Sequence, residues 1–87
     1  MAKQTVKSLH TDEYDKLLAL LREKRLEAKA TRQGLSLELG QAKNYIAKIE
    51  DKDRRVDAVE LLFIASALGI DPVQFFAEFV QAVSENR

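Results

Sequence analysis

The chain has 87 residues, 46% of them hydrophobic, with three Gly and one Pro, which excludes two ordinary domains and a disordered chain. Because there is no Cys, disulfides, thiolate zinc sites and thiol nucleophiles are excluded. No apolar run nears the roughly 20 residues of a membrane span, and the start lacks a signal peptide's apolar core, so we expect a cytoplasmic protein. The 14 basic and 14 acidic residues cancel, yet residues 1–55 carry a net charge of +4 and residues 56–87 one of −4. A local basic surface could therefore face phosphate, although such clusters are more often only solvated.

The first part of the chain predicts a loose arm followed by two helices. Residues 1–11 are polar and lack a sustained period, so we expect a flexible arm. Apolar side chains recur at helical spacing over residues 12–28, which predicts the first helix. Thr31 can cap a short second helix, and Gly40 can end it.

A third helix is predicted over residues 42–50. Ala42, Ile46 and Ile49 recur at positions i, i+4 and i+7, which places them on one face. The same spacing turns Lys48 toward solvent. The element is short, so its position depends on what it packs against.

A fourth helix is predicted after a charged connection at residues 51–56. Asp57 and Glu60 have the spacing of a capping box at its start, and Gly69 closes it. Its composition is apolar on too many sides for a surface element. We therefore expect this helix to lie at the centre of the core.

The last predicted helix begins where Asp71, an N-cap residue, is followed by Pro72 at the first helical position. It runs to about Val83. No segment shows the alternation of a strand. The sequence thus predicts an all-α, five-helix domain over residues 12–84, with a loose tail at 85–87.

Residues 31–50 meet the size requirements of two helices that cross closely at a turn. Ser36 is small enough for the crossing, and Gly40 can adopt the positive φ of the turn. Ile46 and Ile49 supply apolar anchors on the second helix. The same residues also fit a helical hairpin that only packs.

The stretch from Leu21 to Phe76 resembles the XRE-type, Cro and lambda-repressor-like helix-turn-helix DNA-binding domains. The resemblance lies in TRQGLSLELGQAKNYIAKIE (31–50) and RRVDAVELLFIASALGIDPVQFF (54–76), and in the order of the helices. It implies a five-helix DNA-binding domain with its helix-turn-helix at about 31–50.

The resemblance also implies roles for individual side chains. The matching positions are Lys43 and Asn44 for base edges, Arg32, Lys52, Arg54 and Arg55 for phosphates, and Arg25 paired with Glu50 in the framework. Lys48 lies one turn beyond Asn44 on the same face and could reach a base or a phosphate. Lys can donate to guanine and Asn can bridge adenine in the major groove. Each of these side chains could equally be an ordinary solvated residue.

Some positions depart from the family pattern. Lys29 stands where Gly usually ends the first helix, and Gly34 lies inside the second helix. Each change costs about 1 kcal/mol. Ala42 replaces the usual Ser or Thr cap of the third helix, so that its first amides must find Gln41 or a phosphate. We expect reduced stability and affinity, but the same fold.

The last helix has a wide apolar surface. We expect Phe75, Phe79 and Val83 to form a dimer interface, since relatives bind palindromic operators as two-fold dimers. The alternative is that all of these side chains are buried within one copy.

The sequence therefore predicts a homodimeric, sequence-specific regulator of transcription, a repressor that binds double-stranded DNA in the nucleoid of a prokaryote or phage. The alternative is a DNA-binding antitoxin or partner-binding module whose main ligand is a small protein. No enzymatic activity, metal or cofactor is expected, because His10 is the only histidine and the carboxylates form no ligand cluster.

Overall fold

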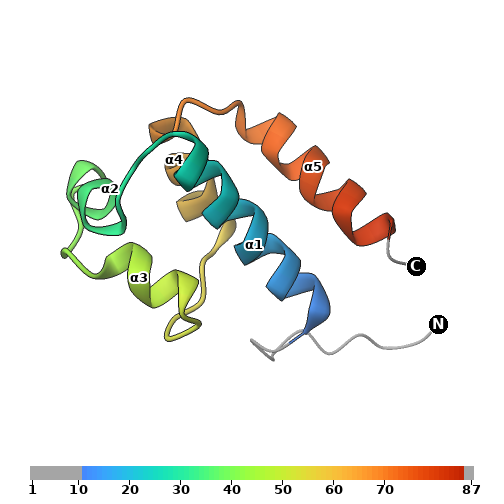
Figure 1. The fold of residues 1–87 in the computed structure, drawn as a ribbon, viewed down its shortest axis with the longest axis horizontal. Coiled ribbons are helices and arrows are strands. Elements are labelled where there is room, and N and C mark those ends of the chain that lie inside the picture. The colour runs from blue at the N-terminus through green and yellow to red at the C-terminus, as the bar shows by residue number, and fades with distance from the viewer. Residues whose placement is uncertain (1–10, 86–87) are drawn as a thin grey trace.

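The computed structural model describes residues 11–85, which form five helices and no strand (Figure 1). The helices are α1 (Asp12–Glu27), α2 (Arg32–Glu38), α3 (Tyr45–Glu50), α4 (Ala58–Ala67) and α5 (Pro72–Ser84). The prediction of an all-α, five-helix chain is confirmed for this part of the sequence. The predicted arm before Thr11, His10 within it, and the tail after Glu85 lie outside the described residues.

Side chains cap the N-termini of four helices. In each cap a side-chain oxygen accepts a backbone N–H from the first turn. Thr11 accepts from Tyr14 in α1 (3.1 Å), Thr31 from Gly34 in α2 (2.9 Å), Asp57 from Glu60 in α4 (2.8 Å), and Asp71 from Val73 in α5 (2.9 Å). In α4 the Glu60 carboxylate also accepts the Asp57 N–H at 3.0 Å, which completes the predicted capping box. Each cap stabilises its helix by about 1 kcal/mol.

The connections between helices turn at residues with positive φ. Gly40 (73°) ends α2 and Gly69 (76°) ends α4, where the absence of a Cβ removes the steric penalty. Lys29 (58°) and Lys52 (65°) adopt the same left-handed conformation after α1 and α3 although they carry a Cβ. At both turns a lysine thus holds a left-handed conformation that Gly would adopt without this penalty.

Helix α3 begins three residues later than predicted, at Tyr45. Ala42 has no side-chain acceptor, and Asn44, the residue before the helix, makes no side-chain cap. The chain instead forms a tight turn in which the Tyr45 N–H donates to the Ala42 carbonyl at 3.0 Å. Lys43 and Asn44 consequently lie in the turn that leads into α3.

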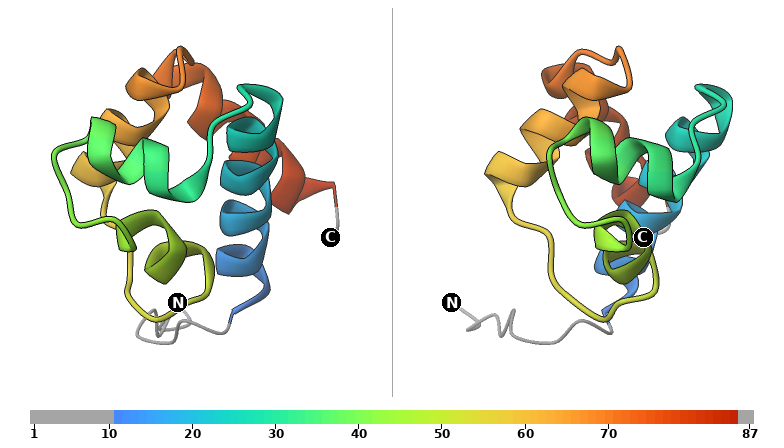
Figure 2. Two further views of the ribbon diagram at one scale, coloured as in Figure 1. Left: turned by 60° about the vertical axis from the view of Figure 1, so that its left-hand side comes forward. Right: turned by 90° about the vertical axis from the view of Figure 1, so that its left-hand side faces the viewer.

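The core is one cluster to which all five helices contribute. Its buried members are Leu17, Leu18 and Leu21 from α1, Leu35 from α2, Ile46 and Ile49 from α3, Val56 from the connection, Ile64 and Ala65 from α4, and Phe75 from α5. Helix α1 packs against both α3 and α5, and α2 packs across the start of α3 (Figures 1 and 2). Burial of these side chains supplies most of the driving force for folding.

Helix α4 is not central to the core, and the sequence prediction was wrong on this point. Of its side chains only Ile64 and Ala65 are buried, whereas Val59, Leu62 and Phe63 are 59%, 45% and 58% exposed. The helix packs against α2 and α5 on one side only. Its composition is apolar all round because a second apolar stripe faces outward.

No single helix within residues 11–85 has both the length and the apolar composition of a membrane span. Helices α4 and α5 meet the two criteria only as a pair, and the pair is bent by 113° at its break.

Candidate nucleic-acid interface

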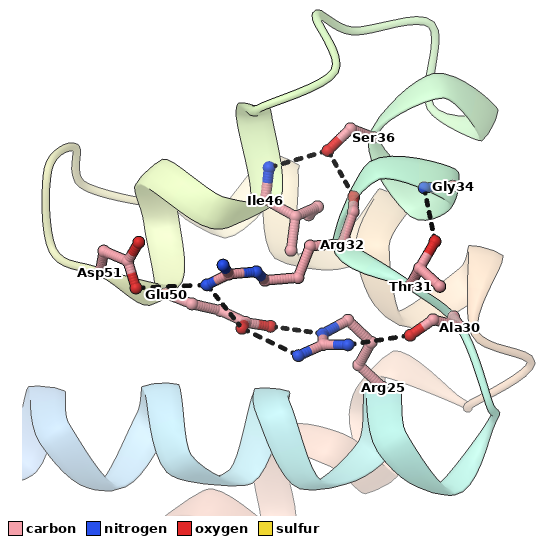
Figure 3. A network of polar contacts seen from close by, with 9 residues as sticks. All are labelled: Arg25, Ala30, Thr31, Arg32, Gly34, Ser36, Ile46, Glu50 and Asp51. Atoms are coloured by element: carbon pink, nitrogen blue, oxygen red, sulfur yellow. Dashed lines mark hydrogen bonds and ion pairs between the residues drawn. The ribbon is translucent and has the colours of Figure 1, made fainter.

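Ser36 joins α2 to α3 at their crossing. Its side chain is fully buried, and its hydroxyl donates to the Arg32 carbonyl at 2.7 Å while it accepts the Ile46 N–H at 2.9 Å (Figure 3). A hydroxyl can do both at once, since it carries one donor and two acceptor sites. Ser36 thus accepts a hydrogen bond from one of the first amides of α3. The sequence had predicted Gln41 or a phosphate as the acceptor.

Arg25 and Glu50 fix the far end of α3 against α1. Arg25 Nε and Nη2 donate to the two carboxylate oxygens of Glu50 at 2.7 and 3.1 Å, and Nη1 donates to the Ala30 carbonyl at 2.9 Å (Figure 3). The two side chains are only 8% and 5% exposed. This bidentate pair therefore ties α1, α3 and the connection before α2 into one unit.

The side chains predicted to read bases are all exposed. Lys43 and Asn44 lie in the turn before α3, and Lys48 lies on α3 one turn beyond Asn44. None of the three makes a side-chain hydrogen bond or ion pair with another residue in 11–85. Their donors are consequently available to a ligand that approaches the start of α3.

Three of the four cations predicted to bind phosphate are held by carboxylates. The pairs are Arg32 with Asp51 (3.3 Å), Lys52 with Asp15, and Arg54 with Glu60 (2.8 Å). The fourth, Arg55, has its guanidinium carbon 5.6 Å from the centre of the Tyr14 ring. This surface is therefore less positive than its lysines and arginines suggest.

Tyr45 belongs to the site, although the sequence reasoning did not select it. Its hydroxyl donates to Glu60 Oε2 at 2.8 Å, the same oxygen that accepts from Arg54, and the Arg54 guanidinium lies 5.1 Å from the Tyr45 ring centre. The network ties the start of α3 to the start of α4. The capping motif identifies Glu60, but no local pattern indicates that it also reaches Tyr45.

The pKa shifts within this network keep Arg54 and Glu60 charged. Burial and the Glu60 carboxylate raise the pKa of Tyr45 to about 12. Burial opposes ionisation of Glu60, but hydrogen bonds from the Asp57 N–H, Arg54 and Tyr45 lower its pKa overall. The hydrogen bond to Glu60 raises the pKa of Arg54. Arg54 and Glu60 are thus charged throughout the neutral range, while the Tyr45 hydroxyl keeps its proton and donates a hydrogen bond to Glu60.

The structure corrects the predicted dimer interface. Phe75 is 2% exposed and lies in the core, so it cannot face a partner. Phe79 and Val83 are partly buried, and the Phe79 ring centre lies 5.6 Å from that of Phe76. The exposed apolar side of α5 is formed by Val73, Phe76 and Val80, which are 78%, 54% and 46% exposed.

A hollow of about 560 Å³ lies between α2, α3 and α4. Its apolar lining includes Leu39, Tyr45, Val59 and Phe63, with carboxylates at its rim. Among residues 11–85, no three side chains of His, Cys, Asp or Glu are grouped so that they could hold a metal ion. The hollow therefore suits an apolar segment better than an ion.

The helix-turn-helix family model HTH_3 matches residues 21–75, more than half of the chain. The chain belongs to the helix-turn-helix family. This family is of the XRE type, and its all-helical, lambda-repressor-like fold agrees with the five helices of the structure. The protein is thus a DNA-binding helix-turn-helix regulator. A comparison with curated proteins gave no match.

The family match shows which parts of this helix-turn-helix regulator follow the common pattern. It contains α2, α3 and α4 completely and extends from Leu21 of α1 to Phe75 of α5. The joint at Ser36 and the pair of Arg25 and Glu50 fall inside it. The part of α5 beyond Phe75 falls outside it.

Proposed function

We propose that this regulator recognises a specific sequence in double-stranded DNA through α3 and the turn before it. The observation that carries the proposal is the set of unpaired donors at Lys43, Asn44 and Lys48, all exposed at the start and outer face of α3. The rigid mounting of α3 by Ser36 supports it, because a reading surface must be held in one orientation.

Base recognition follows from the chemistry of these side chains. The major groove is about 12 Å wide and admits a helix, where the Asn44 amide can bridge N6 and N7 of adenine. Lys43 and Lys48 can donate to O6 and N7 of guanine, and each good contact discriminates by roughly 1–3 kcal/mol. Contacts from Arg32, Lys52, Arg54 and Arg55 to phosphates would set the register of the domain without reading sequence.

The regulator acts as a homodimer on a palindromic operator, and occupancy of that operator in the nucleoid represses transcription. Support comes from the exposed apolar side of α5, where Phe76 also borders a small hollow with Leu62 of α4. An apolar surface that can pair with its own copy builds a two-fold dimer. Such dimers place their recognition helices about 34 Å apart, one turn of DNA.

Selection from random duplex DNA at about 150 mM salt, within the range where phosphate contacts alone bind weakly, tests this function. We expect the protein to enrich one two-fold symmetric site, and the Lys43→Ala, Asn44→Ala variant to enrich none. Arg22→Ala, which removes an exposed cation from α1, is the control and should select the same site. If the unaltered protein enriches no sequence, the proposal is wrong.

A second function, that of a DNA-binding antitoxin or partner-binding module, is favoured by the surface of α4. Val59 and Phe63 are exposed beside the hollow, and residues 56–85 contain no Lys or Arg. A basic, apolar segment of a small protein would complement this surface in both charge and polarity. A small basic protein that co-purifies with the chain at one-to-one stoichiometry, and is lost with Phe63→Ser, would favour this function.

A further inference from the structure

We infer that Asp51 lowers the affinity of the regulator for DNA, because its carboxylate forms an ion pair with Arg32 that competes with a DNA phosphate. The inference rests on the proposed function, since it concerns the surface that would meet DNA. It assigns a role to an acidic residue on a surface where only cations and amides were expected to act.

The geometry places Arg32 between two carboxylates. Arg32 is the first residue of α2, and its Nη1 lies 3.3 Å from Asp51 Oδ1 and 3.9 Å from Glu50 Oε1 (Figure 3). Glu50 already accepts from Arg25 through both oxygens and is 5% exposed. Asp51 is 56% exposed and is therefore the carboxylate that can be exchanged for an external anion.

The charges of this corner cancel. Arg25 and Arg32 carry two positive charges, and Glu50 and Asp51 carry two negative charges, so a phosphate that approaches Arg32 meets a neutral group. Asp51 holds Arg32 through Nη1 alone, so a phosphate that binds Arg32 competes with Asp51 for the charge of the guanidinium, and the exposed Asp51 carboxylate then lies near the DNA backbone. Asp51 consequently opposes binding through both the lost pair and like-charge repulsion.

The exchange has a signature in the salt dependence of binding. A cation that neutralises a phosphate releases counterions from DNA and contributes about −0.9 to the slope of log K against log salt. When Arg32 leaves Asp51, the freed carboxylate attracts a cation from solution and offsets that release. The Arg32 contact therefore adds little to the slope as long as Asp51 is present.

Asp51→Asn should make Arg32 available to phosphate from the start. Because exposed ion pairs are weak, we expect a gain in affinity of about fivefold at moderate salt. The slope should become more negative by up to about 0.9. The gain should appear on operator and unrelated duplexes alike, since phosphates carry no sequence.

Asp53 provides a matched control in the same connection. It is exposed, and its side chain makes no ion pair with any residue that the structure describes. Asp53→Asn changes the net charge by the same amount but frees no arginine. A second control is Asp51→Asn combined with Arg32→Gln, in which the freed cation is missing.

The experiment is a fluorescence anisotropy titration of labelled duplexes between about 50 and 200 mM salt, the range in which phosphate contacts dominate the change in affinity. Thermal unfolding of each variant confirms that it is folded. We expect a larger gain and a steeper slope for Asp51→Asn than for Asp53→Asn, and no gain when Arg32→Gln is also present.

Equal gains for the two aspartate variants, or a gain that persists without Arg32, would overturn the role of Asp51 while the protein still bound its operator. If the unaltered protein and every variant failed to bind any duplex, the proposed function itself would be wrong, and the role of Asp51 with it. The two failures are therefore distinguishable.

Discussion

Arg25 is the charged side chain on which the position of α3 depends most. It donates to Glu50 through two nitrogens and to the Ala30 carbonyl through the third, and it is 7% exposed as a whole residue. Removal of Arg25 leaves the buried Glu50 carboxylate with only the more distant Arg32, whose Nη1 lies 3.9 Å from Glu50 Oε1. The free energy of unfolding therefore depends on Arg25, which compensates the buried Glu50 carboxylate.

Arg25→Met, which keeps much of the side-chain volume, should lower the free energy of unfolding by about 3–5 kcal/mol. Arg22→Met on the exposed side of the same helix should change it by less than about 0.5 kcal/mol. Urea denaturation followed by circular dichroism measures both values. A loss below about 1 kcal/mol for Arg25→Met would contradict a buried, functional pair.

Glu60 should make stability depend on acid pH. Its pKa in the folded chain lies below the ordinary value of 4.5, so the unfolded chain binds more protons and stability rises with pH through this range. The contribution is complete above the unfolded pKa and is lost as the pH falls through the lower, folded pKa. Thermal unfolding from about pH 6 to 3 should show a steeper loss for the unaltered protein than for Glu60→Gln.

The control for this titration is Glu38→Gln, which removes an exposed carboxylate from the end of α2. It should retain the steep acid loss of the unaltered protein. If Glu60→Gln and Glu38→Gln gave the same acid limb, the network of Glu60 with Tyr45 and Arg54 would contribute nothing to stability.

Sequence distance explains which residue contacts could be predicted. The cap between Asp57 and Glu60 spans three residues and follows from local rules. The pair of Arg25 and Glu50 was expected only through a family resemblance, because its partners are 25 residues apart. The contact of Lys52 with Asp15 joins α1 to the connection after α3 and has no counterpart in any local pattern.

At the scale of elements, α3 is too short to be stable alone. It has six residues, and isolated helices below about 12 are marginal in water. Asn44, the residue before the helix, gives it no side-chain cap, and Ser36 of the neighbouring helix satisfies the Ile46 amide instead. Helix α3 thus depends on α2 for its structure.

Ser36→Ala should leave the Ile46 N–H buried without an acceptor and lower the free energy of unfolding by about 1–3 kcal/mol. Ser66 is the matched control, because its hydroxyl donates to a carbonyl four residues earlier but is exposed on α4. Ser66→Ala should stay within about 0.5 kcal/mol of the unaltered protein. Similar losses for both serines in chemical denaturation would contradict a special role for Ser36.

The elements themselves were predictable where caps and glycines mark their ends. The N-caps of α2 and α4 were located correctly, since Thr31 and Asp57 bear local signals. The start of α3 was not, because Ala42 continues the apolar period although the turn there is not yet helical. The prediction that α4 lies at the centre of the core was also wrong, because the composition of a helix does not reveal how many neighbours it packs against.

At the scale of the whole molecule, the exposed donors of α3 and the exposed apolar side of α5 are separated. The exposed donors at the start of α3 and the exposed apolar side of α5 belong to different parts of the fold (Figure 2). A dimer that uses the side of α5 therefore leaves the surface around α3 open to DNA. This segregation is what a two-fold regulator requires.

Phe76→Ser should convert the proposed dimer into a folded monomer, because Phe76 is 54% exposed and contributes little to the core of one copy. Leu26→Ser, which alters an equally exposed side chain on α1, is the control and should remain dimeric. Sedimentation equilibrium reports both masses. A monomeric unaltered protein, or a dimeric Phe76→Ser variant, would contradict the proposed interface.

The measurement that tests the central claim most directly is a double-mutant cycle between Asn44 and the operator. Affinities are measured for the unaltered protein and Asn44→Ala on the selected operator and on duplexes changed at each base pair in turn. We predict that Asn44→Ala abolishes discrimination at one A·T pair, worth roughly 1–3 kcal/mol, and preserves it elsewhere. A uniform loss of affinity across all duplexes would show that Asn44 does not read a base and would contradict recognition through α3.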